Sequence, residues 1–241
     1  MSVFFDQQRV ERIFERPALV PPYDVTDDQV YVLYDPSGGS GAAAIVSVFF
    51  SHGRLVIAGM ETCTESNPEK EHQVLHAHID AVQNAFPTCQ VVLIVDDAYG
   101  NNAQLVAAVL LRRESSNVVV LCENSTIYGI FSKATSLSGY WETMQEKLSS
   151  DGVFLHNAIV CTVANGEEGR RQEVVGELKK QLLALHKVQL APQTPGPREV
   201  LGRGYSDELA VALLKGLYYA QLSQQEHSSL YKRTALIVSE E

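Results

Sequence analysis

Acidic residues at the ends of apolar segments are the side chains of this sequence with the clearest chemical potential. Asp35 follows a β-forming run, Asp96 and Asp97 follow the apolar run QVVLIV, and Asp207 stands at the start of a helical segment. Carboxylates brought together repel one another, and a bound Mg²⁺ or Mn²⁺ relieves that repulsion. Two such ions about 3.5–4 Å apart can hold the attacking water and the leaving oxygen of a phosphodiester. The pattern therefore indicates metal-dependent phosphodiester hydrolysis.

The elements between these acids have the order of an α/β fold. Short turns join three β-forming runs into an antiparallel meander, and helical and apolar strand segments then alternate, which predicts a mixed central sheet flanked by helices. The expected strands are residues 30–34, 44–50, 54–60, 90–95 and 117–122, and the expected helices are 69–86 and 102–113. If the first and fourth strands are neighbours, Asp35 and Asp96 lie side by side.

The second half of the chain supplies the remaining helices expected to flank the sheet, and it contains the third acid, Asp207. Helices are expected at residues 138–148, 170–187 and 206–222, short strands within 153–163, and a loop at 191–203. Ser206 can cap the last helix, and Asp207 and Glu208 fill its first turn, where the helix dipole favours negative charge. We expect one domain over residues 30–222, after a lead-in at 1–29 and before a polar tail at 223–241.

Composition fits one globular domain of 241 residues, with 45% hydrophobic and 20% charged residues. The four cysteines form no C-x-x-C pair, which argues against a zinc knuckle or redox motif. Cys122 and Cys161 lie in apolar runs, which predicts buried thiols and favours a reducing compartment. No apolar run approaches the ~20 residues that span a bilayer, and the N-terminal segment lacks a signal-peptide pattern. A net charge of −10 argues against a protein that coats nucleic acid, but an acidic pocket filled by cations is compatible with a nuclease.

Five segments follow one another along most of the chain. They are VYVLYDPSGGSGAAAIVSVFF with RLVIAGMET, VVLIVDDAYGNNAQLVAAVL, VVVLCENSTIYGIFSKATS, YWETMQEKLSSDGVFLHNAIVCTV and LGRGYSDELAVALLKGLYYAQ. The first contains a strand that runs into an Asp-Pro pair and a Gly-rich turn, and the last leads from a Gly-basic segment into an Asp-acid-Leu helix start. No single motif is specific, but the ordered set resembles the C-terminal nuclease domain of the herpesvirus-type terminase large subunit, the DNA-packaging motor.

This resemblance implies a ribonuclease H-like fold and an endonuclease that cleaves concatemeric double-stranded viral DNA during genome packaging. By the resemblance, Asp35, Asp96 and Asp207 bind two Mg²⁺ or Mn²⁺ ions, and Asp97 and Glu208 are further candidate ligands. Three more residues are expected beside the site or against the DNA: Glu61, Lys133 and Arg203. The implied partners are double-stranded DNA, the terminase ATPase region, the other terminase subunits and the portal, with no membrane, in the host nucleus.

Two departures from the family pattern leave alternatives open. The family usually has glutamate where this chain has Asp96, and because aspartate is one methylene shorter, Asp97 could be the ligand instead. If neither reaches the metal, the domain is an inactive nuclease fold that serves assembly. The chain also lacks a G-x-x-x-x-G-K-[ST] loop, so we expect a separated nuclease domain without that ATPase chemistry. A resolvase or RNA–DNA hybrid nuclease of the same fold is a further alternative.

Other polar groups give weaker indications of chemistry than these acids. His72, His76 and His78 have a metal-like spacing but no matching fourth ligand, so we expect them on a solvated helix face. No G-x-S-x-G elbow occurs, and Ser37 and Ser40 have no identifiable His/Asp partner, which disfavours a nucleophilic hydrolase. Basic residues of the later chain could guide DNA or pair with interleaved glutamates: Arg170, Arg171, Lys179, Lys180, Lys187, Arg198 and Arg203.

Overall fold

The structure is a computed structural model that describes most of the elements expected above. The described residues are 2–3, 5–15, 25, 28–36, 42–64, 67–95, 118–122, 137–162, 168–189, 199–202 and 207–225. The helices are α1 (Gln7–Glu15), α2 (Pro68–Ala85), α4 (Leu137–Ser149), α5 (Glu168–Ala184) and α6 (Glu208–Gln225). The strands are β1 (Ser2–Val3), β2 (Gln29–Asp35), β3 (Ala43–Ser51), β4 (Arg54–Cys63), β5 (Gln90–Val95), β6 (Val118–Cys122), β7 (Val153–Val160), β8 (His186–Gln189) and β9 (Glu199–Gly202).

The main sheet has six described strands in the order β6-β5-β2-β3-β4-β7. β3 is antiparallel to its neighbours β2 and β4, whereas β2–β5, β5–β6 and β4–β7 are parallel pairs. A tight turn at His52 and Gly53, both with positive φ, joins β3 to β4. The expected mixed sheet, built from a meander followed by parallel strands, is confirmed.

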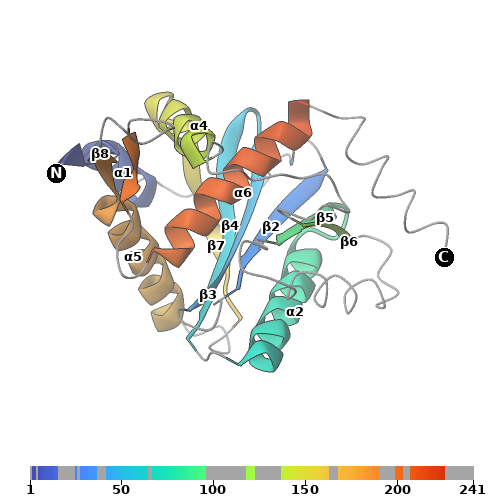
Figure 1. Ribbon diagram of the computed structural model, residues 1–241. Coiled ribbons are helices and arrows are strands. Elements are labelled where there is room, and N and C mark those ends of the chain that lie inside the picture. The colour runs from blue at the N-terminus through green and yellow to red at the C-terminus, as the bar shows by residue number, and fades with distance from the viewer. Residues whose placement is uncertain are drawn as a thin grey trace.

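Each face of the sheet packs against helices, so its central strands are apolar on both sides (Figure 1). One face packs against α2, which contributes Leu75, Ile79 and Val82 to the core. The other face is crossed diagonally by α6, with α1, α4 and α5 completing that layer. Along β2 the side chains alternate accordingly, because Leu33 belongs to the α6-side cluster and Tyr34 to the α2-side cluster.

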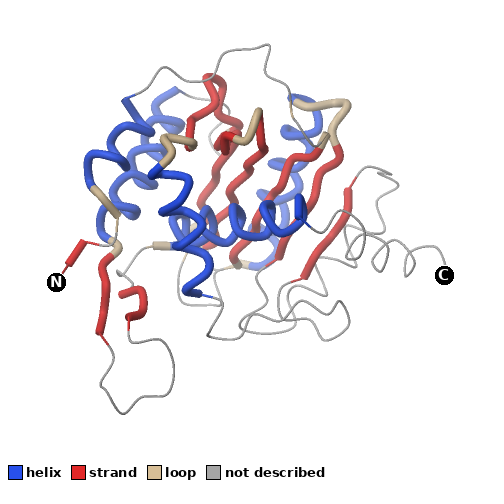
Figure 2. The backbone as a smooth tube through the Cα atoms, turned by 90° about the horizontal axis from the view of Figure 1, so that it is seen from above, coloured by secondary structure: helices blue, strands red, loops and turns tan. Residues whose placement is uncertain are grey.

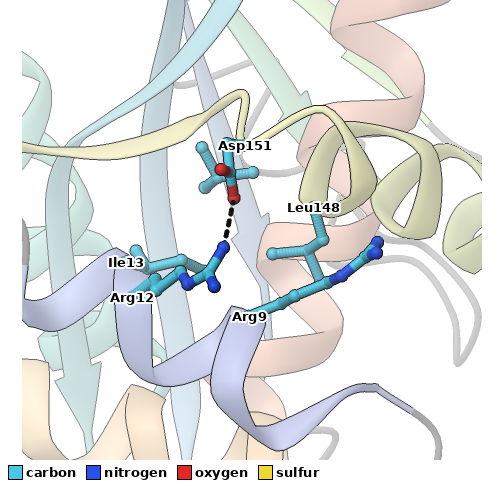
Figure 3. A pocket seen from close by; sticks show the side chains of 6 residues that line it. Arg9, Arg12, Ile13, Leu148 and Asp151 are labelled. Atoms are coloured by element: carbon cyan, nitrogen blue, oxygen red, sulfur yellow. Dashed lines mark ion pairs between the residues drawn. The ribbon is translucent and has the colours of Figure 1, made fainter.

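The N-terminal segment is packed into the fold. Phe5, Val10 and Ile13 are buried in the same core cluster as α6. Arg9 Nη1 donates a 2.6 Å hydrogen bond to Ser149 Oγ, and α1 lies against the turn between α4 and β7 (Figure 3). The lead-in expected at residues 1–29 therefore contributes to the core through α1.

A second, three-stranded sheet corrects two expectations. Its order is β1-β8-β9, and it lies to the side of the main sheet (Figure 2). The helix expected to reach residue 187 ends at Ala184, because the next residues form β8 and pair with β1 and β9. β9 likewise falls inside the expected loop at 191–203. β8 forms by pairing with the distant β1, and β9 forms by pairing with β8, and local periodicity reveals neither pairing.

Some expected elements lie outside the described residues. The helix expected at 102–113 is one, as are Ser206 and the polar tail beyond residue 225. None of the described helices is long and apolar enough to cross a membrane.

Candidate metal centre

The carboxyl ends of the parallel strands meet at one edge of the main sheet. β2 and β5 pair in parallel register up to Tyr34 opposite Val95. The next residue of the chain after Tyr34 is Asp35, and the next after Val95 is Asp96. Asp35 is described and half-buried, whereas Asp96 and Asp97 lie outside the described residues. The last paired residues of β2 and β5 therefore lie opposite each other, and each is followed in sequence by an acid.

Asp35 stands on the α6 side of the sheet. It pairs with Ala44 of β3, which in turn pairs with Thr62 of β4. Side chains alternate along a strand, so Asp35 shares the face of Leu33, a member of the core cluster that contains α6. Asp35 is therefore the last residue of β2 and lies on the face of the sheet that α6 covers.

Asp207 begins that closing helix. Its carbonyl accepts a 2.9 Å hydrogen bond from Val211 N, which makes it the N-cap residue of α6, and the residue is 9% exposed. Further along the helix, a Cβ added to Gly216 would lie 3.5 Å from Leu33 Cβ, so α6 packs directly on β2. Asp35 and Asp207 thus belong to two elements in contact on one face of the sheet. Glu208, in the first turn, is half-buried.

The start of α6 is contacted by a residue of α5 that the sequence analysis did not single out. Gln181 of α5 is 3% exposed, and its Oε1 accepts a 3.1 Å hydrogen bond from Ala210 N. Ala210 is the third residue of α6, and its N–H is one of those that a helix leaves without an internal partner. Because Gln181 is 29 residues away along the chain, no local pattern could have pointed to it.

Glu61 occupies the opposite face from Asp35. It pairs with Ile45, a member of the core cluster on the α2 side, and it is fully buried. Its Oε1 accepts hydrogen bonds from the backbone N–H and the hydroxyl of Thr162, and Cys161 Sγ lies 3.5 Å from Oε2. Burial alone raises the pKa of a carboxylate, but the contacts with His78 and Thr162 hold the pKa of Glu61 below its usual value. Glu61 is therefore an ionised group inside the sheet layer.

His78 corrects the expectation of a solvated histidine face on α2. It is fully buried, with Nε2 2.5 Å from Ser47 Oγ and Nδ1 3.7 Å from Glu61 Oε1, while His72 and His76 are half-buried. In chemical type, the Ser47–His78–Glu61 arrangement matches a nucleophile, a base and an orienting acid. All three side chains are sealed from solvent, so no substrate reaches the serine and the arrangement is structural.

Metal ligation by the expected acids involves groups that the structure only partly describes. Within the described ranges, no three His, Cys, Asp or Glu side chains are grouped so that they could hold a metal ion. Asp96, Asp97, Lys133 and Arg203 all lie outside those ranges. Of the expected ligands, the structure describes Asp35 at the end of β2 and Asp207 at the start of α6.

Comparison with solved structures identifies the architecture. The chain is similar to a human cytomegalovirus terminase nuclease domain, Mn soaked and inhibitor bound, with 13% identity, a TM-score of 0.65 and coverage of 90% of this chain and 95% of that one. A second structure of the human cytomegalovirus terminase nuclease domain gives 16% identity, a TM-score of 0.64 and coverage of 89% and 94%. No protein-family model matches the sequence, and no curated protein sequence matches it.

A bacteriophage protein shows the same likeness over part of its length. The large terminase of the thermophilic bacteriophage D6E has 13% identity and a TM-score of 0.54, and the match covers 91% of this chain and 43% of that one. This chain therefore spans less than half the length of that phage protein. The ribonuclease H-like expectation is confirmed at the level of the fold, and the chain has the architecture of terminase nuclease domains.

Proposed function

We propose that this chain is a metal-dependent DNA endonuclease of the terminase type, which cleaves concatemeric double-stranded DNA during viral genome packaging. The observation that carries the proposal is the parallel register of β2 and β5, which ends one residue before Asp35 and Asp96. Asp207 begins the helix packed on the same face as Asp35. The fold likeness to Mn-soaked terminase nuclease domains supports the same chemistry.

The chemistry of the donors fits hard divalent cations. Asp35, Asp96 and Asp207 would hold two Mg²⁺ or Mn²⁺ ions, with Asp97 or Glu208 as further ligands. Asp207 is 9% exposed, and an ionised group in such a buried position is costly without compensation. The start of α6 contributes to that compensation through its dipole, and a bound cation would add to it.

The protein's own residues fix the geometry of such a site. Ions held by Asp35, Asp96 and Asp207 would supply Lewis-acid activation of the attacking water and charge stabilisation of the leaving 3′ oxygen. Asp35 is held by a strand paired on both sides, so its carboxylate has a rigid origin. Asp207 is held by a helix buried along most of its length. The net charge of −10 disfavours DNA binding away from the metals, which would limit cutting by the free domain.

The proposed partners follow from the packaging context. Double-stranded DNA is the substrate, and the terminase ATPase region, the other terminase subunits and the portal are the proposed assembly partners. The host nucleus is the proposed compartment. No base-reading motif is visible in the sequence, so we expect low sequence preference in cleavage.

A plasmid-nicking assay with Mn²⁺ tests this proposal. Asp35→Asn and Asp207→Asn keep the side-chain shape but remove a ligand charge, and each is expected to lower the cleavage rate by about a hundredfold or more. Asp151→Asn is the matched control, because Asp151 pairs with Arg12 at the turn between α4 and β7 and its φ of 53° suits asparagine.

The alternatives give different results in the same assay. A folded wild-type protein that cleaves with no divalent metal added or present would contradict the metal mechanism. A folded protein that cleaves nothing with any divalent metal would support the inactive assembly module. Preference for a four-way junction or an RNA–DNA hybrid over duplex DNA would support a resolvase or a hybrid nuclease.

A further inference from the structure

The last two residues of β2 belong to opposite faces of the main sheet. Tyr34 is part of the core cluster on the α2 side, and Asp35, the next residue, shares the α6-side face with Leu33. Tyr34 is also paired on both sides, with Val95 of β5 and Ile45 of β3. The tyrosine and the candidate ligand therefore project from one short stretch of backbone in opposite directions.

The Tyr34 side chain contacts the first turn of α2. Its hydroxyl donates a 2.8 Å hydrogen bond to Glu71 Oε2, and the two residues are 1% and 3% exposed. Glu71 lies in the first turn of α2, the helix that covers this face of the sheet (Figure 1). Because both groups are buried, the loss of one leaves the other without the partner that water would otherwise replace. The bond therefore ties the end of β2 to a separate element.

The acceptor of this bond is held in place by the start of α2. Asn67 is the N-cap residue, and its side-chain oxygen accepts a 3.0 Å hydrogen bond from Glu69 N. The Asn67 carbonyl accepts a 3.0 Å hydrogen bond from Glu71 N, and Pro68, with its fixed φ, begins the helix. Tyr34 is therefore anchored to a well-defined helix start.

We propose that Tyr34 and Glu71 are positioning residues for the metal centre, because their bond fixes the direction in which the Asp35 side chain leaves the end of β2. The end of a strand is where its backbone moves most easily. With the tip of the Tyr34 side chain held by α2, rotation of this strand end is resisted, and the Asp35 carboxylate on the other face keeps one orientation. This inference rests on the proposed function, in which Asp35 is a metal ligand.

Tyr31 provides a matched control on the same strand. It is also fully buried, but it belongs to the α6-side cluster, and its hydroxyl donates a 2.7 Å hydrogen bond to Gln29 Oε1. Because this bond joins two residues of β2, its loss does not detach the strand from α2. Tyr31→Phe is therefore expected to leave the metal centre unchanged.

Mn²⁺ binding is the first measurement, made on the full chain by electron paramagnetic resonance at a temperature at which circular dichroism shows every variant folded. Tyr34→Phe is expected to weaken Mn²⁺ binding by about tenfold, a usual effect of losing a group that orients a metal ligand. At saturating Mn²⁺ the kcat of DNA cleavage should remain lowered by about tenfold or more, with the DNA KM unchanged. A loss of stability alone would change none of these values in the folded protein, and Tyr31→Phe should match the wild type in all three.

Two substitutions of Glu71 separate positioning from charge. Glu71→Gln keeps an oxygen that can accept from the Tyr34 hydroxyl, whereas Glu71→Met removes the acceptor at a similar side-chain length. Glu71→Gln is therefore expected to keep the Mn²⁺ affinity close to that of the wild type, and Glu71→Met to weaken it as much as Tyr34→Phe does. Equal losses in the two Glu71 variants would overturn the proposal, because the negative charge and not the hydrogen bond would then govern metal binding.

Hydrogen exchange of the metal-free protein separates this inference from the proposed function. The peptide that contains the end of β2 is expected to exchange faster in Tyr34→Phe than in Tyr31→Phe or the wild type, because the strand end is no longer tied to α2. Equal exchange, or unchanged Mn²⁺ affinity in Tyr34→Phe, would overturn the positioning role. A wild-type protein that binds no Mn²⁺ would overturn the proposed function, while faster exchange in Tyr34→Phe would still support the anchoring of β2 by Glu71.

Discussion

The imidazole of His78 lies against the carboxylate of Glu61, with 3.7 Å between Nδ1 and Oε1, and both side chains are fully buried. The pair joins α2 to β4, and Glu61 is also bonded to Thr162 just beyond β7. A buried polar contact of this kind adds stability only when the remaining lone pairs and protons of its groups are satisfied. Here Ser47 contacts the second nitrogen of His78, so one polar cluster connects β3, β4, α2 and the residue Thr162 just beyond β7.

Removing the Glu61 charge should destabilise the protein in a pH-dependent manner. Glu61→Gln is expected to lower the free energy of unfolding at pH 7 by about 1–3 kcal/mol, because the bonds from Thr162 and His78 lose their charged acceptor. The pKa of Glu61 is lowered in the fold, so its contribution to stability is complete above the ordinary glutamate pKa of 4.5 and is lost as pH falls through the folded pKa. The difference in unfolding free energy between the wild type and Glu61→Gln, measured by urea titration, should therefore shrink below about pH 4.5.

The control for this experiment is Glu69→Gln, an exposed carboxylate in the first turn of α2. Its effect should stay within about 0.5 kcal/mol at pH 7. A Glu61→Gln difference that stays constant from pH 7 to pH 3 would mean that the ionised form of Glu61 gives no stability.

Gly59 is required by the packing of His78. A Cβ at this position would meet His78 Cε1 at 2.8 Å and Val160 Cβ at 3.0 Å, with the histidine itself fixed by its polar contacts. Gly59→Ala is therefore expected to lower the free energy of unfolding by about 1–3 kcal/mol, measured by urea denaturation. Gly176→Ala in α5 is the matched control, since nothing lies within 4 Å of its added Cβ and alanine favours the helix by about 0.5–1 kcal/mol. Equal effects of the two substitutions would contradict the steric account.

The main sheet was predictable from sequence because its signals are local. Continuous apolar runs and the His52-Gly53 turn gave β2 to β5 nearly to the residue, and the acid at the end of β2 was evident. The small sheet was missed, because β8 is a short polar segment that becomes a strand only by pairing with β1, more than 180 residues earlier. Local patterning carries no information on such a partner.

The same reason explains the misplacement of His78. Three histidines within one helix look like a polar face, and only the fold shows that His78 meets Glu61 and Ser47 across two strands. A polar residue within an apolar strand, as at Ser47 and Glu61, was the available signal. Both are buried on the α2 side, where His78 is the polar group that faces them.

The hydrogen bond from Tyr34 to Glu71 should contribute more to the free energy of unfolding than the hydrogen bond from Tyr31 to Gln29. The Tyr34 hydroxyl donates to Glu71 Oε2 at 2.8 Å with both side chains buried, and burial together with Glu71 raises the pKa of Tyr34, so the phenol remains a donor. Tyr34→Phe leaves Glu71 without this donor and is expected to cost about 1–3 kcal/mol in unfolding free energy. Tyr31→Phe removes a 2.7 Å bond to the half-buried Gln29, and should cost about 0.5–1 kcal/mol. The reverse ranking in thermal or urea unfolding would argue against the burial of Glu71.

Divalent metal should stabilise the folded protein through Asp35. If Mn²⁺ binds the folded chain alone, a concentration one hundred times the Kd adds about 2.7 kcal/mol of stability, which raises the Tm by about 5–11 °C in a chain of this size. Chelation should reverse the rise, and Asp35→Asn should abolish most of it, because the strand end then offers a neutral ligand. Asp80→Asn on the exposed side of α2 should keep the full rise in differential scanning fluorimetry. An equal Mn²⁺ response in both variants would mean that the ion binds elsewhere, since Asp35 ends β2 on the face packed against α6 whereas α2 covers the opposite face.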